Sequence, residues 1–183
     1  AQSYASAARD LGVDIATGVQ VNKIRIDRDQ IVGVSTTDGP LNAEQVLVAA
    51  GPWGAALARR AGFAPAVQPI RHQRVRTVPA TGIPTHHPVV RVPDVGCYLR
   101  PEKGGYLYGF FEPDPTAVDP LPDDLTTSQI GPPIATMTAA QHRLLPQFPI
   151  LGDLGIAERI QGFTTFAPDG SYLLGPVPGV AGL

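Results

Sequence analysis

The sequence is poor in cysteine, methionine and tryptophan, with one residue of each among 183. Because Cys97 has no second cysteine to pair with, a disulfide-stapled scaffold is excluded. No apolar run approaches the roughly 18 residues of a membrane-spanning helix, so no membrane partner is expected. The formal charge of −2 at pH 7 offers no basic surface for nucleic acid. The 20 glycines and 20 prolines follow no period, which excludes collagen and favours a turn-rich sheet.

Motifs for several common chemistries are absent as well. The chain has no P-loop, no G-x-G-x-x-G fingerprint and no G-x-S-x-G serine motif. His86 and His87 are adjacent, so on an extended chain they face opposite ways and we expect them in a surface loop. His142 is expected on the inner face of a helix, in a structural role. With one cysteine and scattered histidines, no metal site is expected.

The first third of the chain predicts mixed helix and strand. Its hydrophobic periodicity and turn residues indicate, in order, a helix (2–11), a short buried strand (13–15), a β-meander (19–34), a strand buried on both faces (45–50) and a helix (53–60). A one-residue phase slip inside 19–26 predicts a bulge.

The remainder predicts a sheet of short strands with one helix. Strands are expected at 67–76, 89–92, 96–100, 106–111, 156–166 and 172–174, with 96–111 forming a hairpin. A long surface connection is expected over 112–133 and a helix over 134–145. The fold class is therefore mixed, with α/β character first and α+β character after it.

Basic residues and a histidine gather in the strand predicted at 69–76. By parity His72, Arg74 and Arg76 share one face, and Arg71 lies on the other. Such a face suits an anionic ligand. An exposed edge strand with solvated charges is the alternative that the residues leave open.

Four blocks of sequence resemble the FAD-dependent amine oxidoreductases of the D-amino-acid oxidase superfamily. Residues 46–53, VLVAAGPW, resemble the strand end that passes beside the flavin, where small residues let backbone approach a flat cofactor. Residues 18–24 resemble the strand whose valine meets the adenine. The blocks at 69–73 and 98–113 resemble the dimethylglycine and sarcosine dehydrogenase branch, as does 162–175.

The resemblance implies a division of labour along the chain. Residues 1–64 would be part of an α/β FAD-binding domain, to which 156–183 would return. Residues 65–155 would be a substrate-binding domain with a mainly antiparallel sheet and a flanking helix.

The resemblance also implies roles for particular side chains. His72 and Tyr98 would be the catalytic residues at the flavin face, favouring the neutral amine without acting as strong bases. An arginine would bind the substrate carboxylate, with the choice open among Arg74, Arg76 and Arg100. The residues implied to bind FAD are Val21, Ala50, Gly51, Trp53, Asp169 and Gly170.

Some features of that family are missing from the sequence. The glycine-rich fingerprint, the histidine segment that links FAD covalently in this branch and the final glycine-rich loop are absent. We therefore expect a fragment that alone neither retains FAD nor turns over substrate, since the pyrophosphate cradle supplies much of the affinity.

The expected function is that of a flavoenzyme oxidising a secondary or tertiary amine, such as dimethylglycine or sarcosine, by hydride transfer to FAD. Two alternatives stay open: a glycine- or D-amino-acid-oxidase-like flavoenzyme, and a non-catalytic β-rich binding or interaction module. The expected partners are the amine and the rest of the FAD domain. The expected location is the cytoplasm, or the mitochondrial matrix in a eukaryote.

Overall fold

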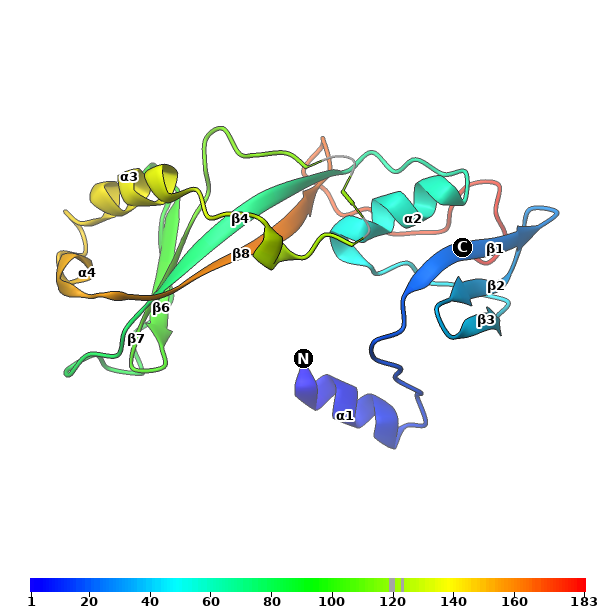
Figure 1. Ribbon diagram of the computed structural model, residues 1–183, viewed down its shortest axis with the longest axis horizontal. Helices are drawn as coiled ribbons and strands as arrows, with labels where there is room; N and C mark the ends of the chain where they lie inside the picture. Colours follow the sequence, from blue (N-terminus) through cyan, green and yellow to red (C-terminus); the bar gives the residue numbers. More distant parts are fainter. Residues whose placement is uncertain (119–120, 123) are drawn as a thin grey trace. The chain divides into compact units, whose positions relative to one another are not determined.

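Figure 1 shows the computed structural model, which describes residues 1–118, 121–122 and 124–183. The chain forms two compact units. Unit 1 comprises Ala1–Ala50, Gly54–Pro65 and Leu173–Leu183, and unit 2 comprises Gly51–Trp53 and Ala66–Tyr172.

Unit 1 contains an antiparallel meander of β1 (Val21–Asp27), β2 (Gln30–Thr36) and β3 (Gly39–Asn42). Arg28 and Asp29 join β1 to β2 with φ of 47° and 63°, the left-handed backbone of a two-residue hairpin turn. The register shifts between Val21 and Lys23, which confirms the bulge predicted from the phase slip, and shifts again between Arg25 and Ile26.

Two helices and the C-terminal segment complete unit 1. The helix α1 (Gln2–Asp10) has no buried residue, whereas α2 (Gly54–Arg60) buries two alanines, Ala55 and Ala58. The C-terminal segment joins the start of β2, where the Ile31 amide donates to the Ala181 carbonyl at 2.9 Å. The end of the chain therefore belongs with the meander.

Three strands predicted from sequence are wrong. Residues 13–15, 45–50 and 172–174 are not strands. Leu47 is 91% exposed and Leu174 is 89% exposed, although both were expected in strands. A strand needs a neighbour that takes up its backbone hydrogen bonds, and no strand among the described residues pairs with these segments.

Unit 2 is built on a five-stranded antiparallel sheet in the order β5-β6-β7-β4-β8. Its strands are β4 (Gln68–Thr77), β5 (Val90–Val92), β6 (Cys97–Glu102), β7 (Gly105–Phe110) and β8 (Ile156–Phe166). The predicted hairpin is confirmed, with Lys103 and Gly104 at positive φ in its turn. The short 3-10 turn η1 (Gly51–Trp53) also belongs to this unit.

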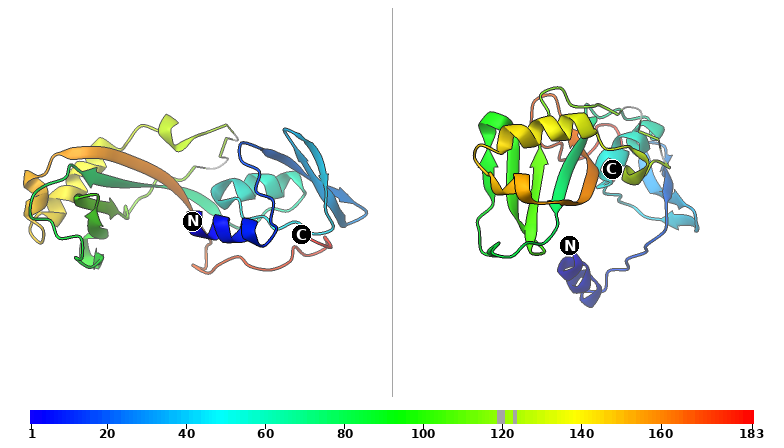
Figure 2. Two further views of the ribbon diagram at one scale, coloured as in Figure 1. Left: turned by 90° about the horizontal axis from the view of Figure 1, so that it is seen from below. Right: turned by 60° about the vertical axis from the view of Figure 1, so that its left-hand side comes forward.

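One face of this sheet is covered by helices. The helix α3 (Ile134–Leu144) lies across it and α4 (Ile150–Asp153) follows (Figure 2). Val75 and Tyr108 pack there with Met137 and Leu144 of α3. We call this side the core face. The opposite side, which carries His72 and Arg74, is the pocket face.

Two further expectations met different outcomes in unit 2. The helix predicted at 134–145 is confirmed, but His142 is exposed, because Met137, Ala140 and Leu144 form the buried side. The expected connection at 112–133 includes residues 119, 120 and 123, which lie outside the described residues. Its other residues include a β-bridge between Ile70 and Ala117 and the 3-10 turn η3 (Thr127–Gln129).

The boundary expected at residue 156 differs from the division into units. Strand β8 pairs with β4 along its whole length, from Gln68 opposite Phe166 to Thr77 opposite Ile156. Unit 1 resumes only at Leu173. The assignment of the two units to cofactor and substrate stays a prediction.

Candidate functional site

A row of directly opposed residues crosses all five strands of the unit 2 sheet. Pairing places Arg91 opposite Tyr98, Tyr98 opposite Gly109, Gly109 opposite Arg74, and Arg74 opposite Ile160. Because opposed residues of antiparallel strands project to the same side, the whole row lies on the pocket face. The sheet therefore brings two predicted site residues, Tyr98 and Arg74, to either side of one glycine.

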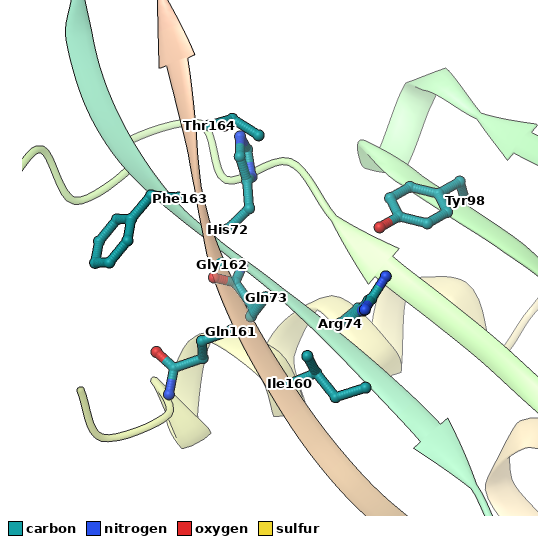
Figure 3. A pocket seen from close by; sticks show the side chains of 9 residues that line it. All are labelled: His72, Gln73, Arg74, Tyr98, Ile160, Gln161, Gly162, Phe163 and Thr164. Carbon is teal, nitrogen blue, oxygen red and sulfur yellow. The ribbon is translucent and has the colours of Figure 1, made fainter. Parts of the chain in front are cut away.

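The glycine in this row makes space for the tyrosine. A methyl group built at Gly109 would overlap the ring and hydroxyl of Tyr98. The phenol ring of Tyr98 therefore lies over the backbone of β7, in the direction of Arg74, as Figure 3 shows. Glycine is required here for close approach, not for a special backbone angle.

A second glycine, Gly162, lies opposite His72. The space where its Cβ would project is open, with no atom within 4 Å. The His72 imidazole contacts two rings, Phe111 at 5.2 Å and Phe166 at 5.8 Å between centroids. Its Nε2 atom is buried and has no hydrogen-bond partner among the described residues.

Gly162 and its neighbours line a cavity of about 260 Å³, to which Tyr98 contributes from across Gly109. Its lining residues are His72, Gln73, Arg74, Tyr98, Ile160, Gln161, Gly162, Phe163 and Thr164. Figure 3 shows the side chains of His72, Arg74, Ile160 and Tyr98 on one side of the β4–β8 pair. Those of Gln161 and Phe163 point to the other side, so they contribute their backbone to the cavity.

The three arginines predicted as carboxylate ligands have different environments. The Arg76 guanidinium is 2.9 Å from Glu158, and the Arg100 guanidinium is 2.5 Å from Glu102. Arg74 lines the cavity, and no described acidic residue pairs with it. Of the three, only Arg74 both lines the cavity and lacks a neutralising carboxylate among the described residues.

Sequence reasoning missed two residues beside the cavity. Phe111 contacts the Tyr98 ring at 5.7 Å as well as His72, and the Arg91 guanidinium lies 5.6 Å from the Phe111 ring centre. The register that aligns Arg91 with Tyr98 depends on the β5–β6 pairing. A three-residue strand gives too little periodicity to predict that register from sequence.

The core face directly behind the cavity carries buried polar atoms. Gln73 is 2% exposed, and neither its amide nitrogen nor its amide oxygen has a described partner. The opposed Gln161 donates its amide to the Ile130 carbonyl. Burial raises the pKa of Tyr108 to about 12, against a smaller lowering by the Arg159 charge. Its hydroxyl has no described partner.

Residues implied to bind FAD lie in both units. In unit 1, Val21 begins β1 and Ala50 is exposed. In unit 2, Gly51 has φ of 53° and Gly170 has φ of 70°, and both have open space at the Cβ position. Open backbone of this kind fits the close approach of a flat ring system.

Trp53 and Asp169 have more defined local roles in unit 2. Trp53 packs edge-on against Phe163 of β8, with ring centres 6.1 Å apart. An Asp169 carboxylate oxygen accepts a hydrogen bond from the Ser171 amide at 3.0 Å, which fixes the turn that holds Gly170.

The remaining histidines lie outside the cavity lining. His86 and His87 are both exposed, as expected for a surface loop, but His87 Nδ1 also lies 2.9 Å from the Tyr106 hydroxyl. Among the described residues no group of three or more His, Cys, Asp or Glu is placed to hold a metal ion. The described helices include none with the length and apolar character needed to cross a membrane.

Comparisons with known proteins cover nearly the whole chain. The model of a family described as DAO, FAD dependent oxidoreductase, matches residues 1–183. The 4-methylaminobutanoate oxidase (formaldehyde-forming) of Paenarthrobacter nicotinovorans is 30% identical over 175 residues, covering 94% of this chain and 21% of that protein. The mitochondrial sarcosine dehydrogenase of Homo sapiens is 27% identical over 185 residues, covering 98% of this chain and 20% of that protein.

A solved structure gives the same picture of the fold. The L-proline dehydrogenase from P.horikoshii matches with a TM-score of 0.82 at 23% identity, covering 99% of this chain and 46% of that one. The likeness confirms the predicted mixed fold class. The chain spans about a fifth of the length of the two curated relatives and less than half of that solved chain.

Proposed function

Because the chain belongs to the family of FAD-dependent oxidoreductases, we propose that its pocket binds the amine substrate of a flavoenzyme. The reaction is oxidation of a secondary or tertiary amine that carries a carboxylate, such as an N-methylated amino acid. One observation carries the proposal: His72, Tyr98 and Arg74, which pairs with no described carboxylate, line one cavity on one face of one sheet.

The cavity favours a small substrate. Its volume of about 260 Å³ lies below the usual range for drug-sized ligands, which begins near 300 Å³. Gly162 leaves open backbone on the β8 side of the cavity, so a planar or extended molecule can lie against it there.

Each polar group of the cavity has a separate task. Arg74 binds the substrate carboxylate through its planar guanidinium, which matches two carboxylate oxygens at once. His72 Nε2 is buried and has no partner among the described residues, so it accepts a hydrogen bond from the N–H of a secondary amine when the neutral imidazole carries its proton on Nδ1. A tertiary amine has no N–H and meets the imidazole by contact alone. The Tyr98 hydroxyl, which lies over Gly109 in the direction of β4, faces the same nitrogen from a second direction.

Apolar rings lie beside the reacting centre. Phe111 and Phe166 contact the His72 ring and Phe111 also contacts Tyr98, while the two phenylalanines are 42% and 44% exposed, so a bound substrate displaces water from their surface. Excluding water favours the neutral amine, whose nitrogen lone pair is free, over the hydrated ammonium. Bound FAD would supply the acceptor for the hydride released from the carbon next to that nitrogen.

The cofactor-contacting residues complete the proposal. We place Val21, Ala50, Gly51, Trp53 and Gly170 beside FAD, with Asp169 fixing the last turn. Unit 1 then belongs to the FAD-binding domain and the unit 2 sheet to the substrate domain. The fold alone would not carry this assignment, because one fold supports many functions.

The test is anaerobic mixing of the holoenzyme containing this chain with N-methylated amino acids, followed as bleaching of flavin absorbance near roughly 450 nm. His72→Asn should slow bleaching at least about tenfold with FAD still bound, because it removes a positioned hydrogen-bond partner. His142→Asn is the matched control, since His142 is exposed on α3. A holoenzyme that no N-methylated amino acid bleaches would overturn the proposal.

A further inference from the structure

We infer that Arg91 forms a second anion-binding position at the end of the pocket row, so that the amine oxidised here carries a second carboxylate. The inference rests on the proposed function, which supplies the oxidation of an amine that carries one carboxylate. It adds that the substrate is a dicarboxylate. It concerns a residue outside both the cavity lining and the residues implied by the family resemblance.

The register places Arg91 on the pocket face. It is opposed to Tyr98, which is opposed to Gly109, which is opposed to Arg74. Three strand spacings of about 4.8 Å separate the backbones of the two arginines, roughly 14 Å in all. Both side chains are exposed and project from the same face, Arg91 from the edge strand β5 and Arg74 from β4, with Tyr98 and Gly109 between them in the row.

Aromatic contacts connect Arg91 to the cavity. Its guanidinium lies 5.6 Å from the centre of the Phe111 ring. The same ring is 5.7 Å from Tyr98 and 5.2 Å from His72. Stacking on an aromatic face fixes the plane of a guanidinium and leaves its N–H edges free to bind a carboxylate.

The charges on this face divide into two rows. In the row with Leu107, Arg76 and Arg100 each pair with a glutamate of the chain. In the row with Tyr98, no acidic residue among those described pairs with Arg74 or Arg91. Two unneutralised guanidiniums flanking an aromatic centre are the pattern expected for a ligand with an anion at each end.

The experiment uses substrate pairs that differ only in the second charge. The N-methyl derivatives of aspartate, glutamate and 2-aminoadipate are each compared with their ω-amides in the holoenzyme. We expect at least one acid to exceed its amide about tenfold in kcat/KM. In Arg91→Gln the acid and its amide should have about the same kcat/KM, whereas Arg91→Lys should keep part of the preference for the acid. Arg143→Gln, which removes the same charge from an exposed side chain of α3, should leave the ratio unchanged.

Binding of glutarate and of its monoamide, measured by calorimetry on the same proteins, separates this inference from the proposed function. If glutarate binds more tightly than its monoamide and Arg91→Gln removes the difference, the second anion-binding position is supported even where no amine is oxidised. If amines are oxidised with no preference for any of the three acids over its amide, or if the preference persists in Arg91→Gln, the inference is overturned. Thermal unfolding of each variant identifies a loss that comes from misfolding.

Discussion

Tyr98 lies across Gly109, its partner on the neighbouring strand, and the missing side chain of the glycine leaves room for the phenol ring. The same glycine separates Tyr98 from Arg74. The geometry of the cavity therefore depends on a residue that contributes no functional group.

Replacing Gly109 with alanine should damage the cavity more than its size suggests. The added methyl group overlaps the Tyr98 ring, so the ring must move. Overpacking of this kind costs about 1–3 kcal/mol. We expect a lower urea midpoint in Gly109→Ala together with slower flavin reduction in the holoenzyme.

The matched variant is Gly162→Ala, because Gly162 lies on the same face with open space at its Cβ position. Its stability should stay within about 0.5 kcal/mol of the wild type, or rise slightly, since alanine restricts the unfolded chain. Equal midpoints for the two variants would show that Tyr98 does not occupy the space over Gly109.

Arg74 and Arg76 should differ in their effect on substrate affinity. Arg74→Gln removes the unpaired guanidinium of the cavity, so KM for an N-methylated amino acid should rise at least about tenfold, equivalent to about 1.4 kcal/mol. Arg76→Gln breaks an ion pair with the half-exposed Glu158, which is worth at most about 1 kcal/mol of stability. A larger rise in KM for Arg76→Gln than for Arg74→Gln would transfer the carboxylate role to Arg76.

The buried Tyr108 should reduce stability in alkali. Its pKa is about 12 in the folded chain, because burial disfavours the phenolate, and about 10 when unfolded. Between these values the unfolded state binds fewer protons, so stability present below about pH 10 is lost as pH rises.

Tyr108→Phe removes this titration and a hydroxyl without a described partner. We expect the variant and the wild type to have similar free energies of unfolding at pH 7. At pH 11 the variant should be more stable than the wild type by about 1 kcal/mol. Urea unfolding at the two pH values measures the change. An advantage that does not grow with pH would mean that the phenol ionises equally in both states.

Cys97 should be chemically inert in the native chain. It is 2% exposed, its Sγ donates to the Val95 carbonyl at 3.2 Å, and burial raises the pKa of its thiol to about 11 against a lowering by Arg143. Iodoacetamide reacts with the thiolate, so alkylation at pH 8 should be on the order of a hundredfold slower than for an exposed thiol.

The comparison thiol is a cysteine at the exposed position 138 of α3, introduced as Thr138→Cys together with Cys97→Ala. Similar labelling rates for this variant and for native Cys97 would indicate that the hairpin opens readily.

The strands of unit 2 could be predicted because turn residues mark where they begin and end. The hairpin turn at Lys103 and Gly104 and the alternation in β4 both appear in the structure as expected. The parity that grouped His72 with Arg74 needed only the two-residue period of a strand.

What failed depended on neighbours that local sequence does not identify. The apolar run at 45–50 reads as a covered strand, yet Leu47 is 91% exposed in the described chain. The choice among three arginines could not be made from sequence. It depended on Glu158 and Glu102, of which Glu158 reaches Arg76 only after β4 and β8 pair.

The pairing of β4 with β8 also sets when the cavity can exist during synthesis. His72 meets Gly162, a residue made 90 positions later, so the β8 side of the cavity is missing until the segment that contains Gly162 has left the ribosome. Contacts of such long range form slowly, because a large loop must close first. Until then the edge of β4 that pairs with β8 lacks its partner strand, and a nascent chain halted before β8 would present that edge to chaperones or to other copies of itself.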